Sequence, residues 1–436
     1  MSTATFLKRL GGRLVVCLVL LALGAGTVWH LNLRGEVDPE TVPDTDAEAA
    51  SSAPATPAQV SRGAYLARAG NCAACHTARG GAPYAGGRGI ATPFGTVYTS
   101  NLTPDAATGL GTWSSAHFWR AMHHGRSKDG RLLYPAFPYP NYTQVTREDA
   151  DAIWAYLRSL PAVSQSHRDH DLRFPFNRPW ALAVWRALFF KPGVYQPVAA
   201  QSADWNRGAY LVRGLGHCNA CHASRNLLGA TSETVELSGG LIPVQNWYAP
   251  SLSDPHEAGV VDWPRQQVVA LLKTGVSPTA SVMGPMAEVV FSSTQHLSEP
   301  DLTAMATFLQ ALAPPANVSK RPSADRASPA WMGKGSKLYE QHCAACHGAS
   351  GQGSPGIYPA LAGNRAVTMG STVNLVRVVL SGGYLPSTQG NPRPFGMPPF
   401  TQTLNEAEIA AVLTFIRGSW GNQASPVTAV AVLNQR

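Results

Sequence analysis

The chain has 436 residues and a formal charge of +8. A length of this order predicts about two to four domains. Only 14% of the residues are charged, and the 41 glycines and 34 prolines favour compact, loop-rich domains. Lys and Arg form no run or stripe along the sequence, so the positive charge does not indicate a nucleic-acid-binding protein.

The N-terminal part predicts a membrane segment. Residues 1–13 are basic and are expected in the cytoplasm, and residues 14–33 are about 20 mainly apolar residues, enough to span a bilayer as a helix. The basic start and Trp29 at the far end fit an N-in, C-out orientation. A cleaved signal peptide is the alternative, with residues 22–24 as the cleavage site. We favour an anchor, because the apolar character continues beyond that site. Residues 34–58 are acidic and rich in Ala, Pro and Ser, as in a flexible tether.

The pattern C-x-x-C-H occurs three times, at residues 72–76, 218–222 and 343–347, and uses six of the seven cysteines. In c-type haem attachment, both thiols of such a motif bond to one porphyrin and the histidine binds the iron. A zinc or thiol-redox protein is a weaker alternative, because three matches that use six of the seven cysteines are hard to explain as accident. We therefore predict three covalently bound haem c groups. Their attachment residues are Cys72, Cys75, Cys218, Cys221, Cys343 and Cys346, and their axial histidines are His76, His222 and His347.

Covalent haem attachment also predicts the compartment. It implies that the haem domains lie on the periplasmic side of a bacterial inner membrane, or in an equivalent compartment. The seventh cysteine, Cys17, lies within the apolar segment and is expected to be an ordinary membrane residue.

An internal repeat accompanies the motifs. Residues 62–66 (Arg-Gly-Ala-Tyr-Leu) recur at 207–211, and residues 335–339 are a looser version. Each copy predicts a short helix that leads into its motif. A helical pattern with an acidic start ends each unit, at residues 146–160, 298–312 and 405–417, and it carries an aromatic residue at a matching place. We expect these aromatic residues, Tyr156, Phe308 and Phe415, to pack against the glycine of the first helix.

Crossing N- and C-terminal helices of this kind resemble the class I cytochrome c fold. The predicted architecture is all-α, with three tandem cytochrome c domains after an N-terminal transmembrane helix. The domains are expected at residues 59–163, 206–314 and 330–421.

Two connectors and a tail complete the chain. Residues 315–329 are rich in Pro, Ser and Ala and predict a plain linker. Residues 164–205 are rich in aromatic side chains, which indicates either a strap packed over the first two domains or a docking surface for a partner or the membrane. The tail at residues 422–436 supports no prediction.

A middle helix in each unit is expected to end at a glycine, and the loop after it should present the sixth iron ligand. Met286 follows Gly275 by eleven residues, with Met283 as the alternative. Met397 follows Gly382 by fifteen residues. Methionine ligation raises the potential of a haem and suits electron transfer. Outside these loops, Met332 and Met369 are expected to be packing residues.

The first unit breaks this pattern. Phe137 lies twelve residues after Gly125, where a ligand is expected, and phenylalanine cannot bind iron. Met122, His123 and His124 are candidate ligands, and an open or water-filled site is a further alternative. The sixth ligand of the first haem therefore stays unassigned.

Longer stretches resemble a known family. Residues 205–211 (Trp-Asn-Arg-Gly-Ala-Tyr-Leu), 218–230 and 284–290 together resemble the triheme cytochrome c subunit of membrane-bound bacterial dehydrogenases. The resemblance covers residues 59–421. The family serves quinoprotein alcohol dehydrogenases, flavin-dependent gluconate-type dehydrogenases and molybdenum hydroxylases of the nicotinate dehydrogenase kind. The stretch 136–139 resembles members that are paired with molybdenum hydroxylases.

The resemblance implies an electron-transfer subunit in the respiratory chain. It would take electrons from a catalytic dehydrogenase subunit and pass them to membrane quinone or a terminal oxidase. No catalytic site for substrate oxidation is expected in this chain, because the sequence has no flavin, pterin or phosphate-binding signature. The alternative function is a haem enzyme or small-ligand binder that uses an open sixth site on the first haem.

Overall fold

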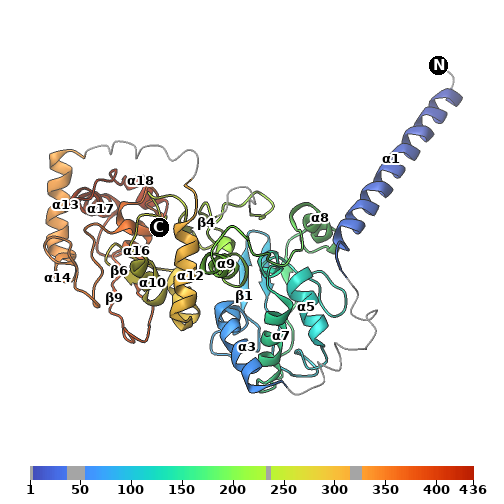
Figure 1. Ribbon diagram of the computed structural model, residues 1–436. Helices are drawn as coiled ribbons and strands as arrows, with labels where there is room; N and C mark the ends of the chain where they lie inside the picture. Colours follow the sequence, from blue (N-terminus) through green and yellow to red (C-terminus); the bar gives the residue numbers. More distant parts are fainter. Residues whose placement is uncertain (1–2, 37–54, 232–236, 315–326) are drawn as a thin grey trace.

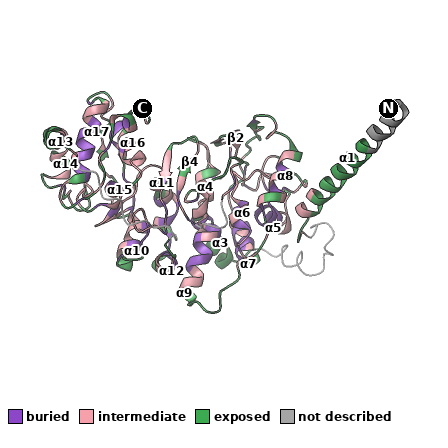
Figure 2. Cartoon of the chain, turned by 90° about the horizontal axis from the view of Figure 1, so that it is seen from above, coloured by how far each residue is buried: buried purple, intermediate pink, exposed green. Residues whose placement is uncertain are grey.

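The computed structural model describes residues 3–36, 55–231, 237–314 and 327–436. Helix α1 (Thr3–Asn32) projects away from a mostly helical head (Figure 1). Its segment Arg13–Asn32 is long and apolar enough to cross a membrane, a property that anchors and signal sequences share. Figure 2 colours most residues of this segment as exposed. Most of the predicted tether and of the linker after the second unit lies outside the described residues.

Three pairs of packed helices form the framework of the head. The first and last helices of each predicted unit pack together over much of their length. These pairs are α3 (Pro57–Ala69) with α7 (Arg147–Arg158), α9 (Ala203–Tyr210) with α12 (Glu299–Gln310), and α13 (Pro329–His342) with α17 (Glu406–Gly418). Each last helix begins where its sequence predicts, because Thr146, Ser298 and Asn405 accept a hydrogen bond from the backbone N–H three residues later.

The crossings depend on the repeated glycines. A Cβ atom added to Gly63 would lie 1.8 Å from the carbonyl oxygen of Ala152, which no real side chain tolerates. The equivalent distances are 2.0 Å at Gly208 and 2.2 Å at Gly335. The predicted aromatic residues Tyr156, Phe308 and Phe415 place their Cβ atoms 2.7–2.8 Å from the same three positions. The expected packing of an aromatic residue over each glycine is confirmed.

Shorter helices fill the space between the paired ones. The predicted middle helices are α5 (Ser115–His124), α10 (Arg265–Thr274) and α16 (Val373–Ser381), and each ends at a glycine with positive φ. The remaining helices are α4 (Cys72–Cys75), α6 (Tyr139–Tyr142), α8 (Pro179–Phe189), α11 (Pro285–Ser292), α14 (Ala344–His347), α15 (Arg365–Thr368) and α18 (Ala429–Leu433).

In the described part of the chain, four small antiparallel sheets, which the sequence did not predict, accompany the helices. The largest has the order β1-β2-β3, with β1 (Gly89–Thr92), β2 (Gly95–Tyr98) and β3 (Asp171–Leu172). The others are β4 (Gly240–Ile242) with β5 (Trp247–Ala249), β6 (Val276–Ser277) with β7 (Ala280–Ser281), and β8 (Gly383–Tyr384) with β9 (Gly396–Met397).

The second unit accommodates one extra residue between helix and motif. Ten residues lead from Gly208 to Cys218, against nine from Gly63 to Cys72. Helix α9 continues into a π-helical turn, Leu211–Leu215, before the motif. A π turn adds one residue to a helix without moving its ends, so it absorbs the insertion.

The aromatic connector packs across the first unit and reaches the second. Phe190 lies edge-on to Tyr139 of the first unit, with ring centroids 4.8 Å apart. Further along, Tyr195 is bonded on both sides: its backbone N–H donates to the Gln144 carbonyl at 3.0 Å, and its hydroxyl donates to Asn206 Oδ1 at 2.8 Å. The connector therefore forms a strap across both units, although one face of α8 stays exposed.

The tail packs on the last unit. Val432 in α18 is fully buried, and Arg436 forms an ion pair with Glu406 at the start of α17, with 2.8 Å between Nε and Oε1.

Candidate haem-binding sites

The three motif histidines have the same hydrogen-bonded geometry. The Nδ1 atom of His76 lies 2.8 Å from the carbonyl oxygen of Ser100. For His222 and Pro250 the distance is 2.7 Å, and for His347 and Pro359 it is 3.0 Å. A carbonyl only accepts, so Nδ1 carries the proton and Nε2 keeps its lone pair for a metal. Burial also lowers the pKa of all three histidines, which favours the neutral, ligating form.

The motif cysteines also repeat one pattern. In each motif the first thiol is partly buried and the second is exposed. Burial, reinforced by the charge of Cys75, raises the pKa of Cys72 to about 12, and burial with Cys346 raises that of Cys343 to about 11. Catalytic thiols have lowered pKa values, so this arrangement does not suit a thiol-redox centre. Among the described residues, no group of three His, Cys, Asp or Glu side chains is placed to hold a metal ion, so the zinc alternative has no support there.

Two arginines hold the turns of the first two motifs. Arg88 donates to the carbonyl oxygen of Ala74, and Arg225 donates to that of Ala220. Each carbonyl belongs to the residue directly before the second cysteine of its motif. No sequence pattern indicates these contacts, because the two arginines lie at different distances from their motifs.

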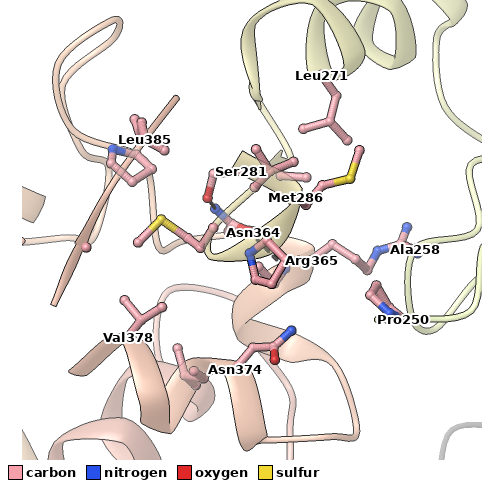
Figure 3. Close-up of a pocket in the computed structure, with 18 of the residues that line it drawn as sticks. Pro250, Ala258, Leu271, Ser281, Met286, Asn364, Arg365, Asn374, Val378 and Leu385 are labelled. Atoms are coloured by element: carbon pink, nitrogen blue, oxygen red, sulfur yellow. Dashed lines mark hydrogen bonds between the residues drawn. The ribbon is translucent and has the colours of Figure 1, made fainter. Parts of the chain in front are cut away.

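A cavity of about 420 Å³ joins the second and third sites. Residues of both motifs line it, and its walls are mostly apolar. Figure 3 shows Met286 and Leu271 facing it from the second unit, and Asn374 and Val378 of α16 facing it from the third. The motif residues on its wall are Cys218, Cys221, His222, Cys343, Cys346 and His347.

The predicted methionines reach this cavity. Met286 is the second residue of α11, and Met397 is the last residue of β9; both line the cavity. The alternative ligand Met283 and the predicted packing residue Met369 line it as well. The choice of Met286 over Met283, and of Met397 over Met369, therefore stays a prediction. Met332 lies on α13, with its sulfur 3.8 Å from the position of a Cβ on Gly418, as expected of a packing residue.

The first site is built differently. Phe137 packs against Tyr142, with ring centroids 5.4 Å apart, and Met122 is buried in the core. His123 is buried and stacked on Trp119, with centroids 4.5 Å apart. His124 is also buried, and its pKa is lowered to about 3 by burial first and then by nearby positive groups.

Those positive groups are His123, Arg186, Arg126 and Arg120, so His124 lies among cations at the end of α5. The sixth ligand of the first haem remains a prediction with the same candidates.

The first and second motifs are in contact. The hydroxyl of Tyr142 donates to the Gly70 carbonyl at 2.8 Å, and its ring lies edge-on to His217, with centroids 5.6 Å apart. Gly70 and His217 come just before the first and second motifs. Across the same boundary, Arg88 forms an ion pair with Glu288 of α11 at 2.8 Å.

These features fit a haem. Each site offers two thiols in one turn and an imidazole whose Nε2 is free to bind iron, and the joined cavity offers apolar walls with thioether sulfurs. Asn71, directly before Cys72, also lines the cavity, and its Oδ1 is buried without a hydrogen-bond partner among the described residues. An unpaired buried oxygen is costly, so this atom is suited to a partner on a bound group.

A family model for cytochrome c matches residues 60–161 and 332–420, so fold and motifs together define a c-type cytochrome. A gluconate 2-dehydrogenase cytochrome c subunit from Pantoea cypripedii is 40% identical over 399 residues, which cover 88% of this chain and 90% of the relative. The cytochrome c subunit of a quinone-type alcohol dehydrogenase from Gluconobacter oxydans (strain 621H) is 36% identical over 392 residues, covering 86% and 81%. One of the subunits of a nicotinate dehydrogenase from Pseudomonas putida is 39% identical over 390 residues, covering 88% of this chain and 32% of the relative.

The chain belongs to the family of cytochrome c subunits of dehydrogenases. It follows that it carries covalently bound haem c and works in electron transfer beside a catalytic dehydrogenase subunit.

Proposed function

We propose that the chain is a membrane-anchored, three-haem electron-transfer subunit. Its three tandem cytochrome c domains, at residues 59–163, 206–314 and 330–421, would each hold one haem c through their C-x-x-C-H motif. The corresponding histidine–carbonyl bonds in all three motifs support this count. So does the repetition of the glycine crossing in all three units. The middle unit shares both features, although the family model matches only the outer two.

The protein's own groups would set the redox properties. When bound, haem iron gains and loses one electron without a change of substrate bonds. His76, His222 and His347 would bind the iron on one side, with the Nδ1 bonds fixing their ring orientation. Met286 and Met397 would bind the second and third irons on the other side. The apolar cavity would exclude water and so favour a high potential.

The observation that carries the proposal is the shared cavity of the second and third sites. Two haems in one cavity would lie close enough for direct electron exchange. The contacts around Tyr142 would bring the first haem site next to the second. The three haems would then form one continuous chain through the head.

The partner would be a catalytic dehydrogenase subunit, either a quinoprotein, a flavoprotein or a molybdenum hydroxylase. In support, relatives are named for gluconate, alcohol and nicotinate dehydrogenases. Electrons would pass from it to quinone or a terminal oxidase, with the head on the periplasmic side and α1 as anchor in the inner membrane. Because the relatives are named as dehydrogenase subunits, they favour electron transfer over a small-ligand site on the first haem.

A pyridine haemochrome assay on the purified full-length chain tests the haem count. Three covalent haems per chain are expected, and two or fewer would contradict the proposal. The partner is tested by purification from detergent-solubilised membranes of the native host. A dehydrogenase subunit should co-purify, and its substrate should reduce the haems in the isolated complex.

A further inference from the structure

Helix α8 of the connector has an exposed apolar stripe. Trp180, Val184 and Leu188 are 59%, 39% and 63% exposed. They are spaced four residues apart, so they lie in one row along the helix. The opposite row, Leu182 and Arg186, is buried against the head. Helix α8 is thus amphipathic in the reverse sense, with its apolar stripe facing outward.

The buried row joins α8 to the end of α1. The side chain of Asn32, the last residue of α1, donates from Nδ2 to the carbonyl of Ala183 at 2.9 Å. Arg186 donates from Nε to Asn32 Oδ1 at 3.0 Å. Figures 1 and 2 both place α8 beside the end of α1, where that helix meets the head.

A buried ion pair fixes the same junction to the first unit. Glu36, four residues after α1 ends, lies 2.8 Å from Arg126 Nε, and both side chains are at most 15% exposed. Arg126 also donates to the Asn32 carbonyl at 3.3 Å. A buried, paired charge of this kind holds a defined geometry, because breaking it leaves an uncompensated charge. The fold therefore fixes where α8 lies relative to the end of α1.

Other exposed apolar side chains extend the stripe. The indole N–H of Trp185 in α8 donates to the Leu228 carbonyl at 2.9 Å, which brings a loop of the second unit alongside. The further exposed residues around this junction are Trp29 and Leu33 at the end of α1, Phe174 before α8, and Leu227 in the loop. Exposed apolar side chains of this size contribute little packing among the described residues, and a group of them marks an interaction surface.

The charged residues of the connector nearest to α8 on either side are all basic. No acidic residue lies between Asp171 and Asp204. Exposed Arg173, Arg178 and Lys191 flank α8 on both sides. An apolar face with basic flanks is the composition that binds an anionic phospholipid surface.

We propose that the stripe of Trp180, Val184 and Leu188 inserts into the interfacial layer of an anionic phospholipid bilayer. This rests on the proposed role of α1 as a membrane anchor, because α1 fixes where the bilayer surface lies. Helix α8 then lies in the surface plane, and the head gains a second membrane contact next to its first unit. With α1 as the single contact, α1 and the head fixed to it could tilt together in the bilayer; with α8 inserted, the first haem site is held at a fixed height above the lipid.

Lipid photocrosslinking on the full-length, haem-loaded chain in its native membranes tests this inference. The photoreactive residue p-benzoylphenylalanine replaces Leu188 in one variant and Val430 in the other. Val430 is the matched control, since it is 64% exposed on α18, at the opposite end of the head from α1. We expect a phospholipid adduct at position 188 and none at position 430. In nanodiscs, replacing anionic lipid by neutral lipid should reduce the adduct at 188.

The outcomes separate this inference from the proposed anchor. If the chain stays in the membrane fraction but position 188 reacts with a protein subunit or with nothing, the stripe faces a partner or solvent and the inference is wrong. Equal lipid adducts at 188 and 430 would contradict it too. A chain recovered entirely in the soluble fraction would overturn both the anchor and the inserted helix.

Discussion

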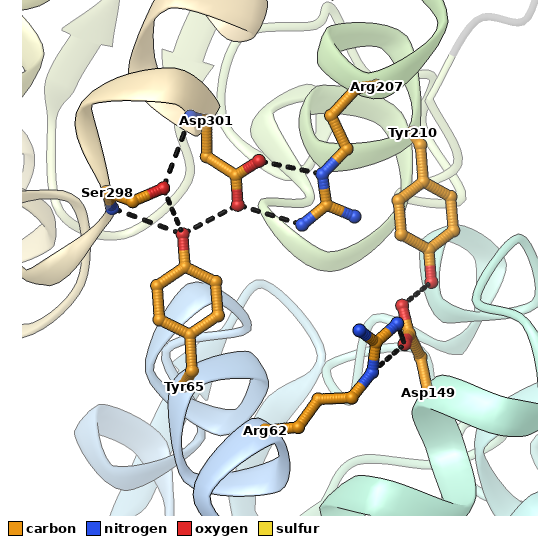
Figure 4. Close-up of polar contacts among 7 residues, drawn as sticks. All are labelled: Arg62, Tyr65, Asp149, Arg207, Tyr210, Ser298 and Asp301. Atoms are coloured by element: carbon orange, nitrogen blue, oxygen red, sulfur yellow. Dashed lines mark hydrogen bonds and ion pairs between the residues drawn. The ribbon is translucent and has the colours of Figure 1, made fainter. Parts of the chain in front are cut away.

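The hydroxyl of Tyr65 donates a hydrogen bond to Oδ2 of Asp301 at 2.6 Å, although the two residues belong to different repeats (Figure 4). The equivalent contact runs from the second unit to the first: Tyr210 donates to Oδ2 of Asp149 at the same distance of 2.6 Å. The recurring Arg-Gly-Ala-Tyr sequence therefore has two structural roles. Its glycine closes the helix crossing inside one unit, and its tyrosine joins that unit to the other.

The arginines of the same sequence pair with the two aspartates. Arg207 donates to both carboxylate oxygens of Asp301, at 2.7 and 2.8 Å, and Arg62 donates from Nε to Asp149 at 3.0 Å. Burial raises the pKa of Asp301, but the hydrogen bonds from Arg207 and Tyr65 outweigh it, so the net pKa lies below its usual value. The tyrosine bond is thus made to a carboxylate, which is stronger than a bond to a neutral acceptor.

Replacing Tyr65 with phenylalanine should destabilise the contact between the first two units. Loss of a hydrogen bond to a charged group costs about 1.5–3 kcal/mol in the free energy of unfolding. Tyr210→Phe should have a similar effect, and urea unfolding followed by circular dichroism measures both. Tyr384→Phe is the control, since Tyr384 is 68% exposed. If all three variants unfold at the same urea concentration, the reciprocal bonds do not stabilise the head.

Two glycines in α13 should respond in opposite ways to alanine. A Cβ on Gly335 would lie 2.2 Å from the Ala411 carbonyl oxygen, so Gly335→Ala must push α13 and α17 apart. A Cβ on Gly333 would meet no atom within 4 Å. Gly333→Ala should therefore raise the thermal midpoint slightly, by the helix propensity gain of about 0.5–1 kcal/mol. Gly335→Ala should lower the thermal midpoint and reduce the yield of haem-loaded protein. Equal midpoints for the two variants would contradict the close helix crossing at Gly335.

A histidine of the connector should make the first unit sensitive to mild acid. The backbone N–H of Tyr98 in β2 donates to Nδ1 of His170 at 3.2 Å, which requires that nitrogen to be unprotonated. Burial first, and then the positive charges of His167 and Arg131, lower the pKa of His170 from 6.5, with Asp169 opposing. Because the unfolded chain takes up the proton first, the stabilisation is complete above pH 6.5 and is lost as the pH falls below it.

The unfolding free energy should therefore decrease between about pH 7 and about pH 5, as denaturant titrations at several pH values can show. His170→Gln keeps an acceptor that does not titrate, so its stability should vary less over this range. An identical pH profile in both proteins would mean that His170 does not control it.

Contacts inside one repeat could be predicted from the sequence, whereas contacts between repeats could not. Gly63 with Tyr156 was predictable, since the same glycine and aromatic spacing recurs in all three units. The helix starts at Thr146 and Ser298 were predictable as well, because a cap acts within one turn. The bond between Tyr65 and Asp301 was not, because it joins residues 236 positions apart through an arrangement of units that no local pattern encodes.

The same limit applies to the haem sites. The motifs identified the thiols and the histidine, but the carbonyl that holds His76 comes from Ser100, in a loop with no signature. The shared cavity likewise needs the third unit to face the second. Tyr248 of β5 and Asn374 of α16 exchange two hydrogen bonds of 2.8 and 2.7 Å across that boundary, and neither residue belongs to a recognisable motif.

Methionine variants should separate iron ligands from neighbours in the same cavity. Met397 and Met369 both line it, and Met369 is only 5% exposed, so burial alone does not distinguish them. A thioether ligand raises the potential of its haem, because it stabilises reduced iron. Met397→Leu should therefore lower one of the three potentials in a spectroelectrochemical titration and allow carbon monoxide to bind that haem. Met369→Leu conserves volume without removing a ligand, so it should leave all three potentials in place.

The pair Met286 and Met283 gives the second haem the same test. Met286 lies on α11, two residues before Glu288, whose ion pair with Arg88 holds that helix against the first motif. Met283 lies before Gly284, in the turn that leads into the helix. A ligand must keep a constant distance to iron, and the helix held by the ion pair provides that better than the turn. Met286→Leu should lower a potential and Met283→Leu should not; the reverse result would move the ligand to Met283.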